Sequence, residues 1–93
     1  MIEAYHLAQK AIADLKFAVY ATLSKAPEIG MTNAEIGRSL GIYMGHVRHE
    51  GHISRTILSL MESEGVVHQN KETKRWTLKK YNMFTDHNDS EEE

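Results

Sequence analysis

The sequence of 93 residues contains no cysteine and a single proline. Without cysteine the chain can form no disulfide, no thiolate metal site and no cysteine nucleophile, which excludes disulfide-rich mini-proteins and zinc ribbons. No apolar run approaches the roughly 20 residues of a membrane span. The N-terminus also lacks the basic start and the apolar stretch of a secretory signal. These absences predict a cytoplasmic protein that does not cross a membrane.

Known catalytic motifs are missing as well. The sequence has no G-x-x-x-x-G-K-[ST] phosphate loop, no G-x-S-x-G elbow, no H-E-x-x-H and no G-x-G-x-x-G. A single domain of this size buries only about two-thirds of its unfolded surface, so an internal cleft would compete with the core for apolar side chains. We therefore predict that the protein is not an enzyme and needs no cofactor.

Charge is distributed unevenly along the chain, although the net charge is only −2. Residues 71–80 hold five lysines or arginines and one glutamate, for a local charge of +4. Residues 81–93 hold five acidic residues and no basic one. Because such a tail has too few apolar groups to offset the entropy of ordering, we predict a folded domain over 1–80 and a disordered acidic tail over 81–93.

The first 24 residues show helical periodicity. Apolar residues follow one another at steps of three and four: Tyr5, Ala8, Ile12, Leu15, Val19 and Leu23. A helix over 3–24 would be roughly 33 Å long. Further apolar residues, among them Leu7 and Phe17, widen its apolar surface beyond one stripe. Either the domain wraps the whole helix, or the excess surface pairs with a second copy, and we predict a homodimer through this helix.

Two shorter helices are predicted next. Pro27 and Gly30 indicate a turn. Thr32 and Glu35 have the spacing of a capping box, which predicts a helix over 33–40. The stretch 41–51 is rich in glycine and histidine and is predicted to be an extended loop. A third helix is predicted over 52–64, with Ile53, Ile57, Leu60 and Met61 turned inward.

The period then changes from helical to alternating. Residues 66–69 and 75–79 alternate apolar and polar side chains on either side of a polar turn, 70–74. This pattern predicts a β-hairpin with Trp76 in the core.

Burying the apolar side of the third helix leaves His52, Arg55, Ser59 and Glu62 on its other side, at steps of three, four and three. Arginine can bond guanine O6 and N7 in a bidentate way, and hydroxyls can bond phosphate. Lysine and arginine in the hairpin turn, Lys71, Lys74 and Arg75, would gain affinity for adjacent phosphates by releasing counterions. Together these features predict a two-point grip on a DNA duplex.

Three segments carry a family resemblance: TNAEIG at 32–37, ISRTILSLMESEGVV at 53–67 and RWTL at 75–78. Over 32–78 the sequence resembles the winged helix-turn-helix domains of small prokaryotic transcription regulators. The resemblance implies an α+β, mostly helical fold of three helices and a β-hairpin wing that binds double-stranded DNA, commonly as a homodimer. It assigns base or phosphate contacts to Ser54, Arg55 and Ser59, and the wing to Lys71, Lys74 and Arg75. The eleven residues of 41–51 depart from the short turn of that family, which implies either an extra function or a different helix placement.

The histidines in this loop leave three alternatives open. His46, His49 and His52 recur every three residues, a spacing from which imidazoles can bind a metal ion. Together with Arg48 they could instead strengthen polyanion binding as the pH falls through about 6.5. They could also be ordinary solvated side chains. We predict no metal site, and we include Arg48 and His52 in the predicted DNA-binding set.

A second function fits the same fold. In it, the long first helix and the acidic tail are the working surfaces of a protein-interaction or oligomerisation module that does not bind DNA. Salt separates the two hypotheses, because phosphate contacts weaken steeply with salt whereas apolar contacts persist.

Overall fold

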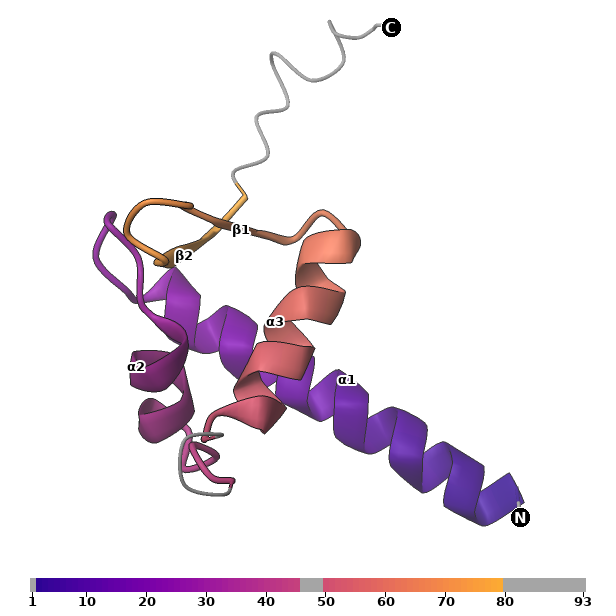
Figure 1. Ribbon diagram of the computed structural model, residues 1–93. Coiled ribbons are helices and arrows are strands. Elements are labelled where there is room, and N and C mark those ends of the chain that lie inside the picture. Colours follow the sequence, from indigo (N-terminus) through magenta and orange to yellow (C-terminus); the bar gives the residue numbers. More distant parts are fainter. Residues whose placement is uncertain (1, 46–49, 80–93) are drawn as a thin grey trace, which may run out of the picture.

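The computed structural model describes residues 2–45 and 50–79, and the structural statements below concern these ranges. Three helices come first: α1 (Ile2–Ser24), α2 (Asn33–Ser39) and α3 (His52–Ser63). An antiparallel hairpin of β1 (Val67–Gln69) and β2 (Trp76–Leu78) follows them (Figure 1). The predicted α+β class and the order of its elements are confirmed.

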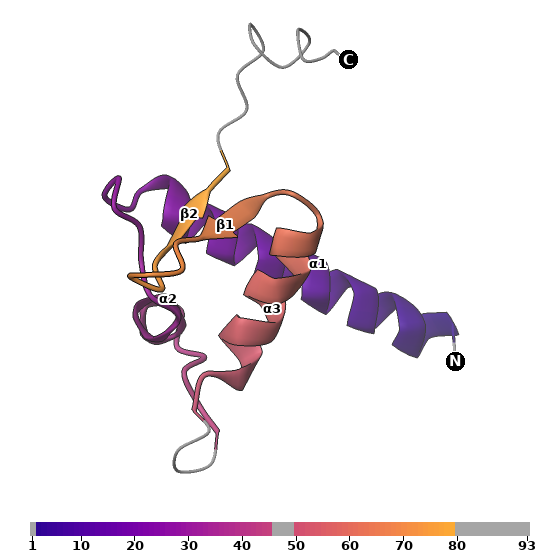
Figure 2. The ribbon, with the colours of Figure 1, turned by 45° about the horizontal axis from the view of Figure 1, so that its top comes forward.

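The core lies where α2, α3 and the hairpin meet the C-terminal half of α1. Both ribbon views show α3 crossing α1 with α2 beside it, while the N-terminal half of α1 extends away from the other elements (Figures 1 and 2). Every element contributes to the buried apolar cluster, which consists of Val19, Leu23, Ile36, Ile57, Leu58, Met61, Val67 and Trp76. Trp76 is only 6% exposed, as predicted for a core residue.

Only the C-terminal half of α1 is covered. Val19 and Leu23 are buried and Leu15 is partly buried, but every residue from 2 to 14 is exposed. The apolar surface of the helix therefore exceeds what one copy of the domain covers. Within the described residues, no helix is both long and apolar enough to span a membrane, α1 included.

The connection between α1 and α2 is fastened to the hairpin. Met31 and Trp76 exchange two backbone hydrogen bonds, of 3.0 and 2.7 Å, so Met31 extends the sheet by one position beyond β2. Gly30 has a φ of +87°, and a Cβ there would lie 2.3 Å from the Trp76 carbonyl oxygen. The predicted capping box is present, because Thr32 Oγ1 accepts from Glu35 N and Glu35 Oε1 accepts from Thr32 N. The end of α1 is thereby linked to the start of α2.

Two backbone hydrogen bonds fold the connection from α2 to α3 back on itself. Ile42 N donates to Gly37 O at 2.8 Å, and Gly51 N donates to Met44 O, also at 2.8 Å. The second bond brings Gly51 beside Met44, so these two residues of the connection lie close together. The described residues of 41–51 form no helix or strand, as predicted for a loop.

Candidate nucleic-acid interface

The start of α3 is held by a single carbonyl group. Gly51, the residue before the helix, has a φ of +87°. Its carbonyl oxygen accepts from Arg55 N at 3.0 Å, Asn33 Nδ2 at 3.2 Å and Ser54 Oγ at 3.3 Å. A Cβ on Gly51 would lie 2.6 Å from Asn33 Nδ2 and 2.9 Å from the Tyr43 ring. The first turn of α3 is thus fixed against α2 and against the connection between them.

The buried side of α3 differs from the predicted one. Ser54, Ile57, Leu58 and Met61 are buried, whereas Leu60 is 38% exposed and Ile53 is only partly buried. The reason lies at the contact with α2, where a Cβ on Gly37 would be 3.0 Å from Ser54 Oγ. Only small residues allow the helices to approach so closely. Ser54 has no exposed surface and is therefore removed from the predicted DNA-contact set.

The outward side of α3 carries the predicted polar residues. His52, Arg55, Ser59 and Glu62 are all exposed. No hydrogen bond or ion pair with another described residue engages the Arg55 guanidinium. Sequence reasoning missed Thr56, which is exposed four residues after His52 and next to Arg55, a position that helical spacing alone could have identified. The first two turns of α3 thus present one cation and several hydroxyl or imidazole groups to solvent.

Acidic groups lie near both ends of α3: Glu50 two residues before the helix, and Glu62 and Glu64 at its C-terminal end. Glu62 lies in the last turn, and the Glu64 carboxylate follows the helix, 2.6 Å from Lys16 Nζ on α1. Within α3 itself, the cation Arg55 lies near the N-terminus and the carboxylate of Glu62 lies in the last turn. A phosphate backbone would be attracted by Arg55 and repelled by Glu62.

The hairpin turn is ordered by its own side chains. Asn70 Oδ1 accepts from Glu72 N at 2.8 Å and from Thr73 N at 2.9 Å. Lys74 has a φ of +66°, and its backbone N–H donates to Asn70 O at 2.7 Å. Lys71 and Lys74 are both exposed on this turn. Two cations are thus presented by a turn of defined shape.

Arg75, predicted as a third cation of the wing, is engaged within the fold. Its Nη1 donates to Gly30 O at 2.8 Å and to Glu35 Oε1 at 3.2 Å, and its side chain is 29% exposed. The Thr32 backbone N–H, followed by the charge of Arg75, holds the pKa of Glu35 below its usual value. Arg75 therefore joins β2 to the start of α2, and the position of its guanidinium is set by these contacts.

The remaining predicted site residues are outside the described ranges. Arg48, His46 and His49 lie in 46–49, and the predicted acidic tail lies in 80–93. Of the three histidines proposed as alternative metal ligands, the structure places only His52, at the start of α3. Among the described residues, no three potential ligands gather into a metal-binding group.

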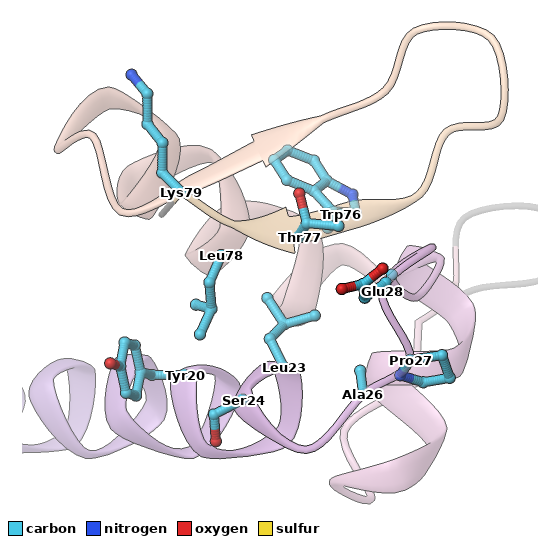
Figure 3. Close-up of a pocket in the computed structure, with 11 residues that line it drawn as sticks. Tyr20, Leu23, Ser24, Ala26, Pro27, Glu28, Trp76, Thr77, Leu78 and Lys79 are labelled. Atoms are coloured by element: carbon cyan, nitrogen blue, oxygen red, sulfur yellow. The ribbon is translucent and has the colours of Figure 1, made fainter. Parts of the chain in front are cut away.

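A groove of about 830 Å³ lies elsewhere on the molecule, between the end of α1 and β2 (Figure 3). Tyr20 and Leu23 rise from α1 toward Leu78, while the Lys79 side chain points away from them. The acidic group of the lining is Glu28. The groove is lined by both apolar and polar residues, and its lining does not include the exposed residues of α3.

Comparison with known proteins gives no assignment: the chain matches no protein-family model, no curated protein and no solved structure. Function must therefore be argued from the residues themselves.

Proposed function

We propose that the protein binds double-stranded DNA, as a small transcription regulator does, with α3 in the major groove and the hairpin turn on the neighbouring backbone. The observation that carries the proposal is the outward side of α3, where Arg55 is exposed and engaged by no other described residue. A guanidinium in that position is available to a guanine edge or a phosphate.

The shape of α3 and its surroundings supports this role. The helix is closely packed on one side through Ser54 and Leu58, so its other side is held rigidly. Rigid presentation limits the entropy lost when side chains bind a groove. Because Arg55 lies near the N-terminus of α3 and Glu62 in its last turn, the N-terminal end is the one expected to enter the major groove. Glu62 then stays away from the phosphates.

The connections of the domain support the same proposal. The hydrogen bond from Gly51 N to Met44 O brings the start of α3 close to the chain that leaves α2, an arrangement compatible with the resemblance to winged helix-turn-helix domains. Lys71 and Lys74 stand on a separate, ordered turn, so phosphate contacts from the hairpin can add to those of α3.

The test is a titration of the protein with a generic duplex, followed by NMR at about 50 mM salt, where phosphate contacts are strong. We expect shifts at Arg55, Thr56 and Ser59 and at the hairpin turn. Affinity should fall steeply with added salt. The Arg55→Ala variant should bind roughly 5- to 150-fold more weakly, the range that one base-contacting arginine provides.

The matched control is Lys10→Gln, which removes the same unit of charge from the exposed half of α1, where Lys10 pairs with Asp14. It should change affinity far less than Arg55→Ala does. Absence of binding at low salt would refute the proposal, and equal losses in the two variants would refute the assigned surface. Only the absence of binding would favour the interaction module without DNA binding.

A further inference from the structure

Arg38 is an exposed cation in the last turn of α2. The central carbon of its guanidinium lies over the ring of Tyr43, 4.6 Å from the ring centroid. This distance is within the range of a cation–π interaction. Among the described residues, no hydrogen bond or ion pair engages this guanidinium. Stacking on the ring therefore orients Arg38 and leaves its N–H donors for another partner.

The carboxylate of the same helix does not neutralise Arg38. Glu35 lies three residues before it, a spacing at which an ion pair can form on a helix. The Glu35 carboxylate instead accepts from Thr32 N at 3.0 Å and from Arg75 Nη1 at 3.2 Å. Its ion pair is with Arg75, from the other side of the domain's chain. The charge of Arg38 is therefore still available to an anion.

The Tyr43 ring is held against the backbone of two glycines. A Cβ on Gly37 would lie 3.0 Å from Tyr43 Cδ1, and a Cβ on Gly51 would lie 2.9 Å from Tyr43 Cε1. Such a close approach is possible because neither glycine has a side chain. Gly37 belongs to α2 and Gly51 directly precedes α3, so the ring is fixed between these two helices. It is a platform of defined position for the Arg38 guanidinium.

These contacts place Arg38 near the start of α3, because its guanidinium and Gly51 both lie against the Tyr43 ring. In both ribbon views the C-terminal end of α2 and the N-terminal end of α3 lie at the same end of the molecule (Figures 1 and 2). Arg55, the cation of the proposed DNA-binding surface, is in the first turn of α3. Glu50, just before Gly51, offsets one of these two positive charges. This end of the domain therefore keeps a net positive charge.

We propose that Arg38, oriented by the Tyr43 ring, binds a backbone phosphate of the DNA duplex beside the groove that α3 enters. A guanidinium matches the geometry of phosphate oxygens, and one that is already oriented loses less entropy on binding. Phosphate contacts position a protein on the duplex, so Arg38 would fix the register of Arg55 in the groove. Tyr43 acts through Arg38 and is a positioning residue. The inference rests on the proposed binding of DNA.

The phosphate contact is tested by fluorescence anisotropy of the full chain with a generic duplex at several salt concentrations. Arg38→Gln should reduce the slope of log affinity against log salt by about one unit, as expected for one phosphate. The control Lys10→Gln removes the same charge from α1 and should leave the slope unchanged. No binding by the parent protein would overturn the proposed function and this inference together. Binding by the parent with an unchanged slope in Arg38→Gln would overturn this inference alone.

The positioning role of Tyr43 is tested through its ring. Tyr43→Leu should weaken duplex binding by about 2- to 5-fold, the range of an exposed cation–π interaction, whereas Tyr43→Phe keeps the ring and should keep the affinity. Adding Tyr43→Leu to Arg38→Gln should cause no further loss, because the ring acts through Arg38. An equal loss in both backgrounds would overturn the positioning role and leave Tyr43 as a support of the fold. So would a loss in Tyr43→Phe as large as that in Tyr43→Leu.

Discussion

Two arginines, Arg55 on α3 and Arg75 before β2, show how differently the outward side of α3 and the base of the hairpin are used. Arg55 is exposed, with its guanidinium engaged by no other described residue. Arg75 is only partly exposed and joins the Gly30 carbonyl to the Glu35 carboxylate. Sequence alone gave both arginines a role in DNA binding. The structure teaches that a cation on a predicted binding surface must be tested for stability and for binding separately.

The largest effect on the free energy of unfolding is expected at Gly51, which precedes α3. Gly51→Ala should lower the free energy of unfolding by about 3 kcal/mol, because a Cβ adds steric conflict with Asn33 and Tyr43 to the cost of a left-handed conformation. Gly41→Ala is the matched control, since Gly41 has a φ of +72° with open space around it. It should cost only about 1 kcal/mol. Urea unfolding of both variants measures the difference, and equal costs would contradict the close junction at Gly51.

Arg75→Ala should also destabilise the fold, by about 1–2 kcal/mol, mainly through the lost hydrogen bond to the Gly30 carbonyl. The exposed pair with Glu35 adds little. Arg55→Ala should change stability by less than about 0.5 kcal/mol. Thermal unfolding of the two variants side by side sharpens the comparison. A larger loss of stability in Arg55→Ala than in Arg75→Ala would contradict the difference described for the two arginines.

The side chains of Lys71 and Lys74 on the hairpin turn should contribute to DNA affinity without contributing to the stability of the fold. Lys71→Gln and Lys74→Gln should each reduce the dependence of log affinity on log salt by about one unit, as expected for one phosphate contact. The variants should unfold at the temperature of the parent protein, because both side chains are exposed. Fluorescence anisotropy at several salt concentrations measures this slope. An unchanged slope in both would remove the turn from the interface.

The smallest effect concerns the ionisation of Glu35. Its pKa is held below the usual 4.5 first by the Thr32 backbone N–H and then by Arg75, so Arg75→Gln should raise that pKa only in part. A folded-state pKa below the unfolded one means that the carboxylate stabilises the fold above about pH 4.5. This contribution is lost as the pH falls through the lowered pKa. NMR titration of the Glu35 carboxyl group checks both statements, and a full return to the usual value would assign the shift to Arg75 instead.

Local patterns predicted most of the fold. Spacing of apolar residues located the helices and the hairpin, and Thr32 with Glu35 predicted the capping box, because these signals lie within a few residues. Contacts between distant residues were not predictable in this way. The bond between Gly51 and Met44, the burial of Ser54 against Gly37 and the engagement of Arg75 with Gly30 each depend on how separate elements meet. The sequence therefore predicted correctly that His52, Arg55, Ser59 and Glu62 are exposed, and it was wrong about the burial of Ser54 and Leu60.

The central claim is tested most directly by measuring duplex affinity and unfolding free energy on the same preparation of Arg55→Ala. The account predicts that binding weakens by roughly 5- to 150-fold while stability stays within about 0.5 kcal/mol of the parent protein. Duplex affinity that is unchanged in this variant would contradict the claim that the outward side of α3 is the DNA-binding surface.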